Sequence, residues 1–201
     1  MQTRGSFALR LLAEMVSVVF AVLLALIANE WRQAVHTQKR VNVALQNIRA
    51  EATENINSLR TTSAIQQTYL DSLRATFTRP SRRQRANQPF AQVYLELQSK
   101  IGQGLLVPNV NTSSWRSAVS TGLISEFRYP VVLKLSDIQS AVDILERRVA
   151  RLESTMYSSE FLQAKAARVV TGKIMFMLND LLDVEHQLLN HYSALLELIP
   201  A

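Results

Sequence analysis

The feature that most limits how this chain can fold is an apolar run near its N-terminus. The residues from 15 to 28 are apolar apart from Ser17. The run alone is short for a membrane-spanning helix, which needs about 20 residues. Extending it backwards supplies the length and takes in Arg10 and Glu14, which lie one helical turn apart and can neutralise each other. We therefore predict a transmembrane anchor over residues 7–29.

The residues around this run favour a retained anchor over two alternatives. Trp31 stands where the run stops, as expected for an aromatic residue at a membrane interface. A cleaved signal peptide needs small residues at −3 and −1, but cleavage after Ala28 would put Leu26 at −3. A core helix of a soluble protein would not explain an apolar run at the extreme N-terminus with charge directly beyond it. For Glu14, a pair with Arg10 or a contact with another protein helix is favoured over proton transfer.

Two signals about the orientation of the anchor oppose each other. More basic residues follow the run than precede it, which favours a cytoplasmic C-terminal domain. A short basic tail before a single apolar helix is, however, the usual layout of a signal anchor, which exports the rest of the chain. We predict the exported arrangement.

The chain after the anchor is expected to be helical. Glycine and proline number only five each, which favours long helices over strands and turns. A long helix is predicted over residues 30–77. Its stripe of apolar or small residues, at spacings of three and four, consists of Val41, Leu45, Ile48, Ala52, Ile56, Leu59, Leu70, Leu73 and Phe77. The stripe weakens between Thr61 and Gln67, where looser packing is expected.

Residues 78–129 are expected to form a basic loop and short helices. Two prolines and four arginines lie between residues 78 and 89. A solvated loop is favoured there over a phosphate or lipid-headgroup site, because no aromatic residues interleave with the arginines. Short helices are predicted over residues 90–101 and around Trp115, the second ending at Gly122.

The clearest helix signal begins at Pro130, a residue suited to the first turn of a helix. Apolar residues then alternate at spacings of four and three, which predicts a coiled-coil seam. An antiparallel partner within the chain would satisfy the seam as well as a second copy would. The seam consists of Val131, Leu135, Ile138, Val142, Leu145, Val149, Leu152 and Met156.

A second apolar stripe, from Val170 to Ile199, predicts a C-terminal helix with a kink or short turn at Gly172 or at Asn179 and Asp180. The expected fold is all-α: an N-terminal transmembrane helix continuing into a long helix, and an antiparallel coiled-coil bundle capped by short helices. The expected segments are a tail (1–6), the anchor (7–29), a long helix (30–77), the basic loop with short helices (78–129), and the heptad and C-terminal helices (130–201).

Signatures of catalysis or of cofactor binding are missing from the sequence. Cysteine is absent, which excludes disulfides and thiolate chemistry, and neither a P-loop nor a GxGxxG, GxSxG or HExxH motif occurs. We expect no catalytic, cofactor or metal site. Four neighbouring residues suggest a hard-metal site, but the wet face of an amphipathic helix explains them better: Asp180, Asp183, Glu185 and His186. The net charge of +6 is attributed to basic membrane flanks, with lipid and not nucleic acid as the partner.

The anchor resembles that of a widespread group of uncharacterised bacterial membrane proteins, in which an apolar helix with an early Glu ends in an Ala-Leu-x-x-Asn-x-Trp-like signature. The matching residues here are Glu14, Ala25, Leu26, Asn29 and Trp31. Further similarity covers Leu45, Ile48, Glu51 and Asn55, and a Trp-x-x-Ala-x-x-Thr-Gly stretch at Trp115, Ala118, Thr121 and Gly122. The resemblance implies a single-pass protein of the bacterial inner membrane and no particular reaction.

Two functional hypotheses follow. The first is a membrane-anchored helical scaffold or accessory subunit that self-associates or joins a membrane protein complex, with Trp115 and Val119, or the exposed side of the seam, as contact surfaces. The second is a membrane-coupled sensor, which requires a concave pocket with convergent polar groups.

Overall fold

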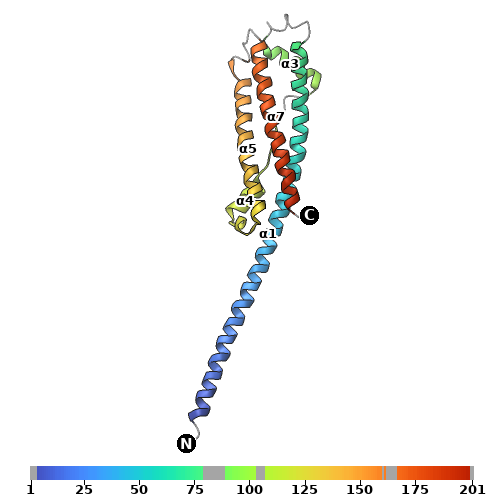
Figure 1. The fold of residues 1–201 in the computed structure, drawn as a ribbon. Helices are drawn as coiled ribbons and strands as arrows, with labels where there is room; N and C mark the ends of the chain where they lie inside the picture. Colours follow the sequence, from blue (N-terminus) through green and yellow to red (C-terminus); the bar gives the residue numbers. More distant parts are fainter. Residues whose placement is uncertain (1–3, 79–88, 103–106, 160, 162–166, 200–201) are drawn as a thin grey trace. The chain divides into compact units, whose positions relative to one another are not determined.

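The computed structural model describes residues 4–78, 89–102, 107–159, 161 and 167–199, with the side chains of 4–13, 77–78 and 167–168 left out. All secondary structure in these ranges is helical, which confirms the predicted all-α class (Figure 1). The helices are α1 (Arg4–Thr78), α3 (Phe90–Ile101), α4 (Ser113–Ser120), the 3-10 helix η1 (Leu123–Glu126), α5 (Tyr129–Met156) and α7 (Ala167–Leu198).

The chain divides into two units, residues 1–44 and residues 45–201. Helix α1 is 75 residues long and contributes to both. In its described part, the first unit consists of helix α1 alone. The second unit contains the remaining helices and a hydrophobic core.

The second unit is an antiparallel bundle of three long helices: residues 45–78 of α1, α5 and α7 (Figure 1). As residue numbers rise along α1 they fall along α7 in the pairs that join the two helices, and the same holds for α5 and α7. The α1–α7 pairs are Arg49–Leu196, Asn55–Tyr192, Gln66–Glu185 and Arg74–Asn179, and the α5–α7 pairs are Lys134–His191 and Arg148–Asp180.

The heptad residues of α5 are packed within the single chain. Val131, Leu135, Ile138, Val142, Leu145 and Leu152 are buried, whereas Val149 and Met156 are half-buried. Facing them, α7 supplies fully buried leucines such as Leu181 and Leu188. The seam is therefore covered without a second copy, and it offers no exposed contact surface of the kind expected from the sequence.

Helix α7 runs unbroken through the positions where a kink was expected. It has 32 residues and continues through Gly172 and Asn179. The Asn179 side chain points back along its own helix and donates to the Met175 carbonyl (2.7 Å). The alternative of a short turn is wrong, because packing of the flanking Ile174, Leu178 and Leu181 outweighs the low helix propensity of single Gly and Asn residues.

Two arginines complete the C-terminal end of α7. The last carbonyl groups of a helix lack partners within the helix. Arg49 of α1 donates to the Leu196 carbonyl (3.0 Å) and to that of Ile199, and Arg128, just before α5, donates to that of Leu198. All three long helices are thus joined at this end of the bundle.

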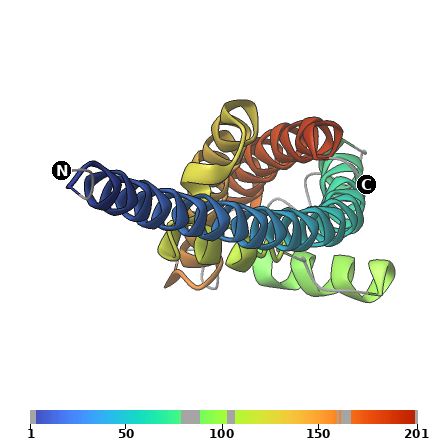
Figure 2. The same ribbon diagram turned by 90° about the horizontal axis from the view of Figure 1, so that it is seen from below.

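The short helices lie at opposite ends of the bundle and do not form the single cap that was expected (Figure 1). Helix α3 packs against α1 and α7 near residue 73, whereas α4 and η1 lie near the start of α5. Figure 2 shows α3 (green) beside the later part of α1 (teal). Non-helical residues 107–112 precede α4 and follow the surface of α1. Gly122, with φ of 71°, ends α4 as predicted and begins η1.

Candidate functional site

The first notable surface is the apolar N-terminal part of α1. Its ten large apolar side chains from Met15 to Ile27 are between 51% and 64% exposed. Every residue from 14 to 36 is exposed, so this part of α1 is exposed on all sides. Within the described side chains, α1 is the one helix that is long and apolar enough to cross a membrane.

Two of the three predicted interface residues can be placed. Trp31 is 73% exposed, just beyond the apolar segment, and Glu14 is exposed at its beginning. The side chain of Arg10 lies outside the described residues, and so does the expected Arg10–Glu14 pair. The basic loop at residues 79–85 also lies outside them.

The second notable site is a polar layer inside the bundle, formed by Ser63 and Gln66 of α1 and Glu185 of α7. Glu185 and Gln66 are both 0% exposed. The Gln66 Nε2 atom donates to Glu185 Oε1 (2.8 Å), and Ser63 Oγ is hydrogen-bonded to Glu185 Oε2. Burial raises the pKa of the Glu185 carboxyl above its ordinary value, against the opposing effects of these hydrogen bonds and of His186.

This layer corrects two expectations. The apolar stripe weakens between Thr61 and Gln67 because its positions there are occupied by buried polar residues, not because the packing is loose. Glu185 is not on the wet face of α7 with Asp183 and His186, which are exposed. The sequence signal that could have located the site is the register itself, because the stripe spacing of α1 places Ser63 and Gln66 on its buried face.

A third cluster joins Asn55 of α1 to Tyr192 of α7 and to the segment before α4. Asn55 Nδ2 donates to Tyr192 Oη (3.0 Å) and to the Asn111 carbonyl (2.7 Å), and Asn55 Oδ1 accepts from the Asn111 backbone N–H (2.9 Å). Burial strongly raises the pKa of the Tyr192 hydroxyl, so it stays neutral and acts as a hydrogen-bonding group. The cluster leaves no reactive group exposed, and its role is to position the chain.

Residues Glu51, Asn55 and Ser58 form a row on α1 that holds the segment from 109 to 114. Glu51 Oε2 accepts from Ser113 Oγ (3.0 Å) and from the Ser114 backbone N–H (2.9 Å), and Ser58 Oγ donates to the Asn109 carbonyl (3.2 Å). A carboxylate is favourable at the N-terminus of a helix, here α4. The stretch of α1 around Asn55 and the beginning of α4 therefore meet in the structure.

The surface proposed around Trp115 is only partly exposed. Trp115 is half-buried, and Val119, one turn further along α4, is 47% exposed. Tyr129 and Leu133, at the beginning of α5, are also exposed apolar residues near this end of the bundle.

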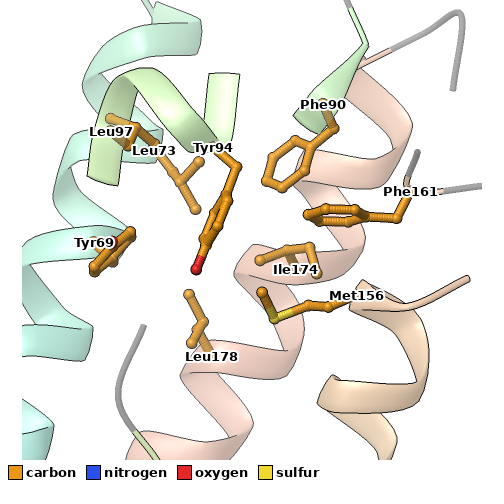
Figure 3. A pocket seen from close by; sticks show the side chains of 9 residues that line it. All are labelled: Tyr69, Leu73, Phe90, Tyr94, Leu97, Met156, Phe161, Ile174 and Leu178. Atoms are coloured by element: carbon orange, nitrogen blue, oxygen red, sulfur yellow. The ribbon is translucent and has the colours of Figure 1, made fainter. Parts of the chain in front are cut away.

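At the opposite end, α1, α3 and α7 enclose a small apolar cavity (Figure 3). The Tyr94 ring lies between Tyr69 (ring centroids 6.3 Å apart) and Phe161 (6.1 Å). Desolvation by burial raises the pKa of Tyr69 to about 12, with a smaller contribution from Tyr94. The free volume of about 10 Å³ is room for one water molecule at most. The cavity lacks the convergent polar groups that a ligand pocket requires.

The acidic cluster near residue 183 does not converge on one point. Glu185 points into the core, Asp183 and His186 are exposed, and Asp180 pairs with Arg148 of α5. Among the described residues, no group of three His, Asp or Glu side chains is placed to hold a metal ion.

No family model matches the sequence, and neither the comparison with curated proteins nor that with solved structures gives a match.

Proposed function

We propose that this protein is a single-pass protein of the bacterial inner membrane whose helical bundle acts as a scaffold or accessory subunit, without catalysis of its own. The observation that carries the proposal is the exposure of every large apolar side chain from Met15 to Ile27. Fully burying one such side chain is worth about 1.5–3 kcal/mol, so ten partly covered ones amount to on the order of 10 kcal/mol. A helix of this kind requires an apolar surrounding that the chain itself does not supply.

The interior of the bundle favours a binding role over catalysis, because its buried polar groups hold the helices together. The interior groups Asn55, Tyr192, Gln66 and Glu185 hydrogen-bond to each other or to neighbouring segments, Glu51 holds the start of α4, and the apolar cavity is too small for a substrate. Exposed apolar groups suited to a partner include Val119, Tyr129 and Leu133 at the end of the bundle that contains residue 45, and others such as Tyr157 and Phe176 lie elsewhere on the bundle. Residues 28–44 connect this end of the bundle to the apolar segment along the chain, and this closeness in sequence favours a partner that is itself at the membrane.

The membrane arrangement is tested with reporter fusions after Ala201 that are active on only one side of the membrane. We propose an exported C-terminal domain, so a reporter active in the periplasm should give signal. Activity of the cytoplasmic reporter alone would reverse the orientation and leave the anchor intact. Recovery of the chain in the soluble fraction after cell breakage would overturn the anchor itself.

The partner is tested by a photo-crosslinking residue placed at Val119 or Leu133, with Asp183 of α7 as an exposed polar control. Val119 and Leu133 should crosslink to a second copy or to one identified membrane protein, whereas Asp183 should not. A photo-crosslinking residue placed in that partner should in turn crosslink to this chain. Equal labelling at all three positions would contradict a specific contact at this end of the bundle.

A further inference from the structure

We propose that Glu185 is a pH-sensitive latch between α1 and α7, which holds the two helices together while its carboxyl is protonated and loosens them when it ionises. This inference does not rest on the proposed function, because it concerns the bundle alone. It starts from a carboxyl that is 0% exposed and bonded only to uncharged groups.

Both protonation states find hydrogen-bond partners, but only one avoids a buried charge. The Ser63 hydroxyl can donate or accept, so a protonated Glu185 donates to it through Oε2 and an ionised one accepts from it. Gln66 Nε2 donates to Oε1 in both states. The hydrogen bonds from Ser63 and Gln66 favour the ionised form, but they offset only part of the cost of its desolvated charge.

No cation from α1 faces the carboxyl in the part of the chain that the structure describes. The buried α1 residues at this level are Thr62, Ser63 and Gln66, which are neutral. The nearest basic residue in sequence on this side, Arg60, is exposed. On α7 itself, the neighbouring Asp183 and His186 are exposed, and His186 only partly offsets the effect of burial on the Glu185 pKa.

Helix α5 supplies no counter-charge either. The Lys134–His191 and Arg148–Asp180 pairs bracket the stretch of α5 that lies level with Glu185. Of the charged residues between them, Asp137 pairs with Lys134, whereas Asp143, Glu146 and the one cation, Arg147, are exposed to solvent. The buried residues of this stretch are apolar, namely Ile138, Ala141, Val142 and Leu145.

The direction of the pH effect follows from these surroundings. A carboxyl whose pKa is raised in the folded state binds its proton more tightly there than in the unfolded chain, where the pKa is about 4.3. Its stabilising contribution is complete below that value and is lost as pH rises through the raised folded-state pKa. Over that interval the unfolding equilibrium constant should rise by about tenfold per pH unit.

The Glu185 side chain lies between two helices, so its ionisation changes how tightly α1 is held to α7 as well as the stability of the bundle. Ser63 and Gln66 belong to α1, the helix that also contains the apolar segment, whereas Glu185 belongs to α7. Loosening this one layer releases α1 from α7 midway between the Asn55–Tyr192 and Arg74–Asn179 contacts.

The test uses the full-length chain in detergent micelles, with spin labels on cysteines introduced at Thr61 and Gln187. Both positions are exposed, and the native chain has no cysteine. The distance distribution should be narrow at pH 5 and should broaden towards longer distances by pH 9. In Glu185→Gln it should stay narrow at both pH values, and in the control Asp183→Asn it should respond like the wild type.

A broadening of equal size in Glu185→Gln and in the wild type would overturn the proposal. If Glu185→Gln fails to fold, Glu185→Leu replaces it, since an apolar residue of similar volume commonly preserves a buried site. Infrared spectra of the unsubstituted chain give a second readout. The carbonyl band of a protonated, buried carboxylic acid should disappear over the pH range of the distance change, and its absence at pH 5 would equally refute the latch.

Discussion

Helix α1 has an apolar first half (residues 15–27) whose side chains are exposed, and a second half (residues 45–78) that packs into the bundle. Leu23, in the first half, is 51% exposed, and Leu59, in the second, is 0% exposed. In the second half even Asn55 and Gln66 are buried, because α7 supplies their hydrogen-bond partners. A helix therefore does not determine by itself which environment its side chains need. The neighbours of the second half lie within the chain, whereas the described residues provide no cover for the apolar side chains of the first half.

The largest expected effect breaks this contrast by making the first half polar. Val19→Arg combined with Phe20→Arg should abolish membrane association, because each charge near the centre of a span costs about 2.5–3.5 kcal/mol. The measurement is the fraction of protein in the membrane pellet after an alkaline wash. Thr61→Arg with Thr68→Arg, two exposed positions of the same helix, is the control and should leave the pellet fraction unchanged. Retention of the first variant in the membrane would contradict the anchor.

The next effect compares the two matched leucines. Leu59→Ala should lower the free energy of unfolding of the bundle by about 2–5 kcal/mol, because it leaves a cavity in a closed core. Leu23→Ala should change it by less than about 0.5 kcal/mol. Urea unfolding of the full chain in micelles measures both. Similar losses for the two variants would mean that the halves of α1 are not energetically distinct.

A smaller effect is expected for the buried polar residues of the second half. Asn55→Ala should cost about 1–3 kcal/mol, because it leaves the Tyr192 hydroxyl and the Asn111 backbone N–H without their partner. The control is Asn57→Ala, two residues away and exposed. The same unfolding measurement applies, and faster amide exchange at Asn111 should accompany the loss. Unchanged exchange at Asn111 would show that the segment before α4 does not depend on Asn55.

The smallest effect concerns the surface of the second half. Asp71→Asn removes an ion pair with Arg74 whose side chains are 60% and 46% exposed. Pairs this exposed contribute about 0.2–1 kcal/mol at most and weaken as salt is added. Unfolding at low and high ionic strength should give nearly the same midpoint for wild type and variant. A loss larger than that for Asn55→Ala would reverse the ranking of buried and exposed polar groups.

The sequence by itself determined the helical class and the boundaries of the clear apolar patterns. The start of α5 at Tyr129 and Pro130, the end of α4 before Gly122 and the apolar stripe of α1 follow from spacing and from the conformational preferences of proline and glycine. The run from Met15 to Ala28 likewise follows from composition alone.

Only the tertiary structure decided which polar residues are interior and what covers each apolar face. Glu185 looks like a surface residue in the sequence, because a carboxylate on an amphipathic helix is normally solvated. Its burial depends on the approach of Ser63 and Gln66, which lie 122 and 119 residues away in the sequence. From the sequence alone, the α5 seam is likewise compatible both with an interface between two copies and with packing inside one chain. The physical reason is that local spacing sets the face a residue occupies, whereas long-range packing sets what that face meets.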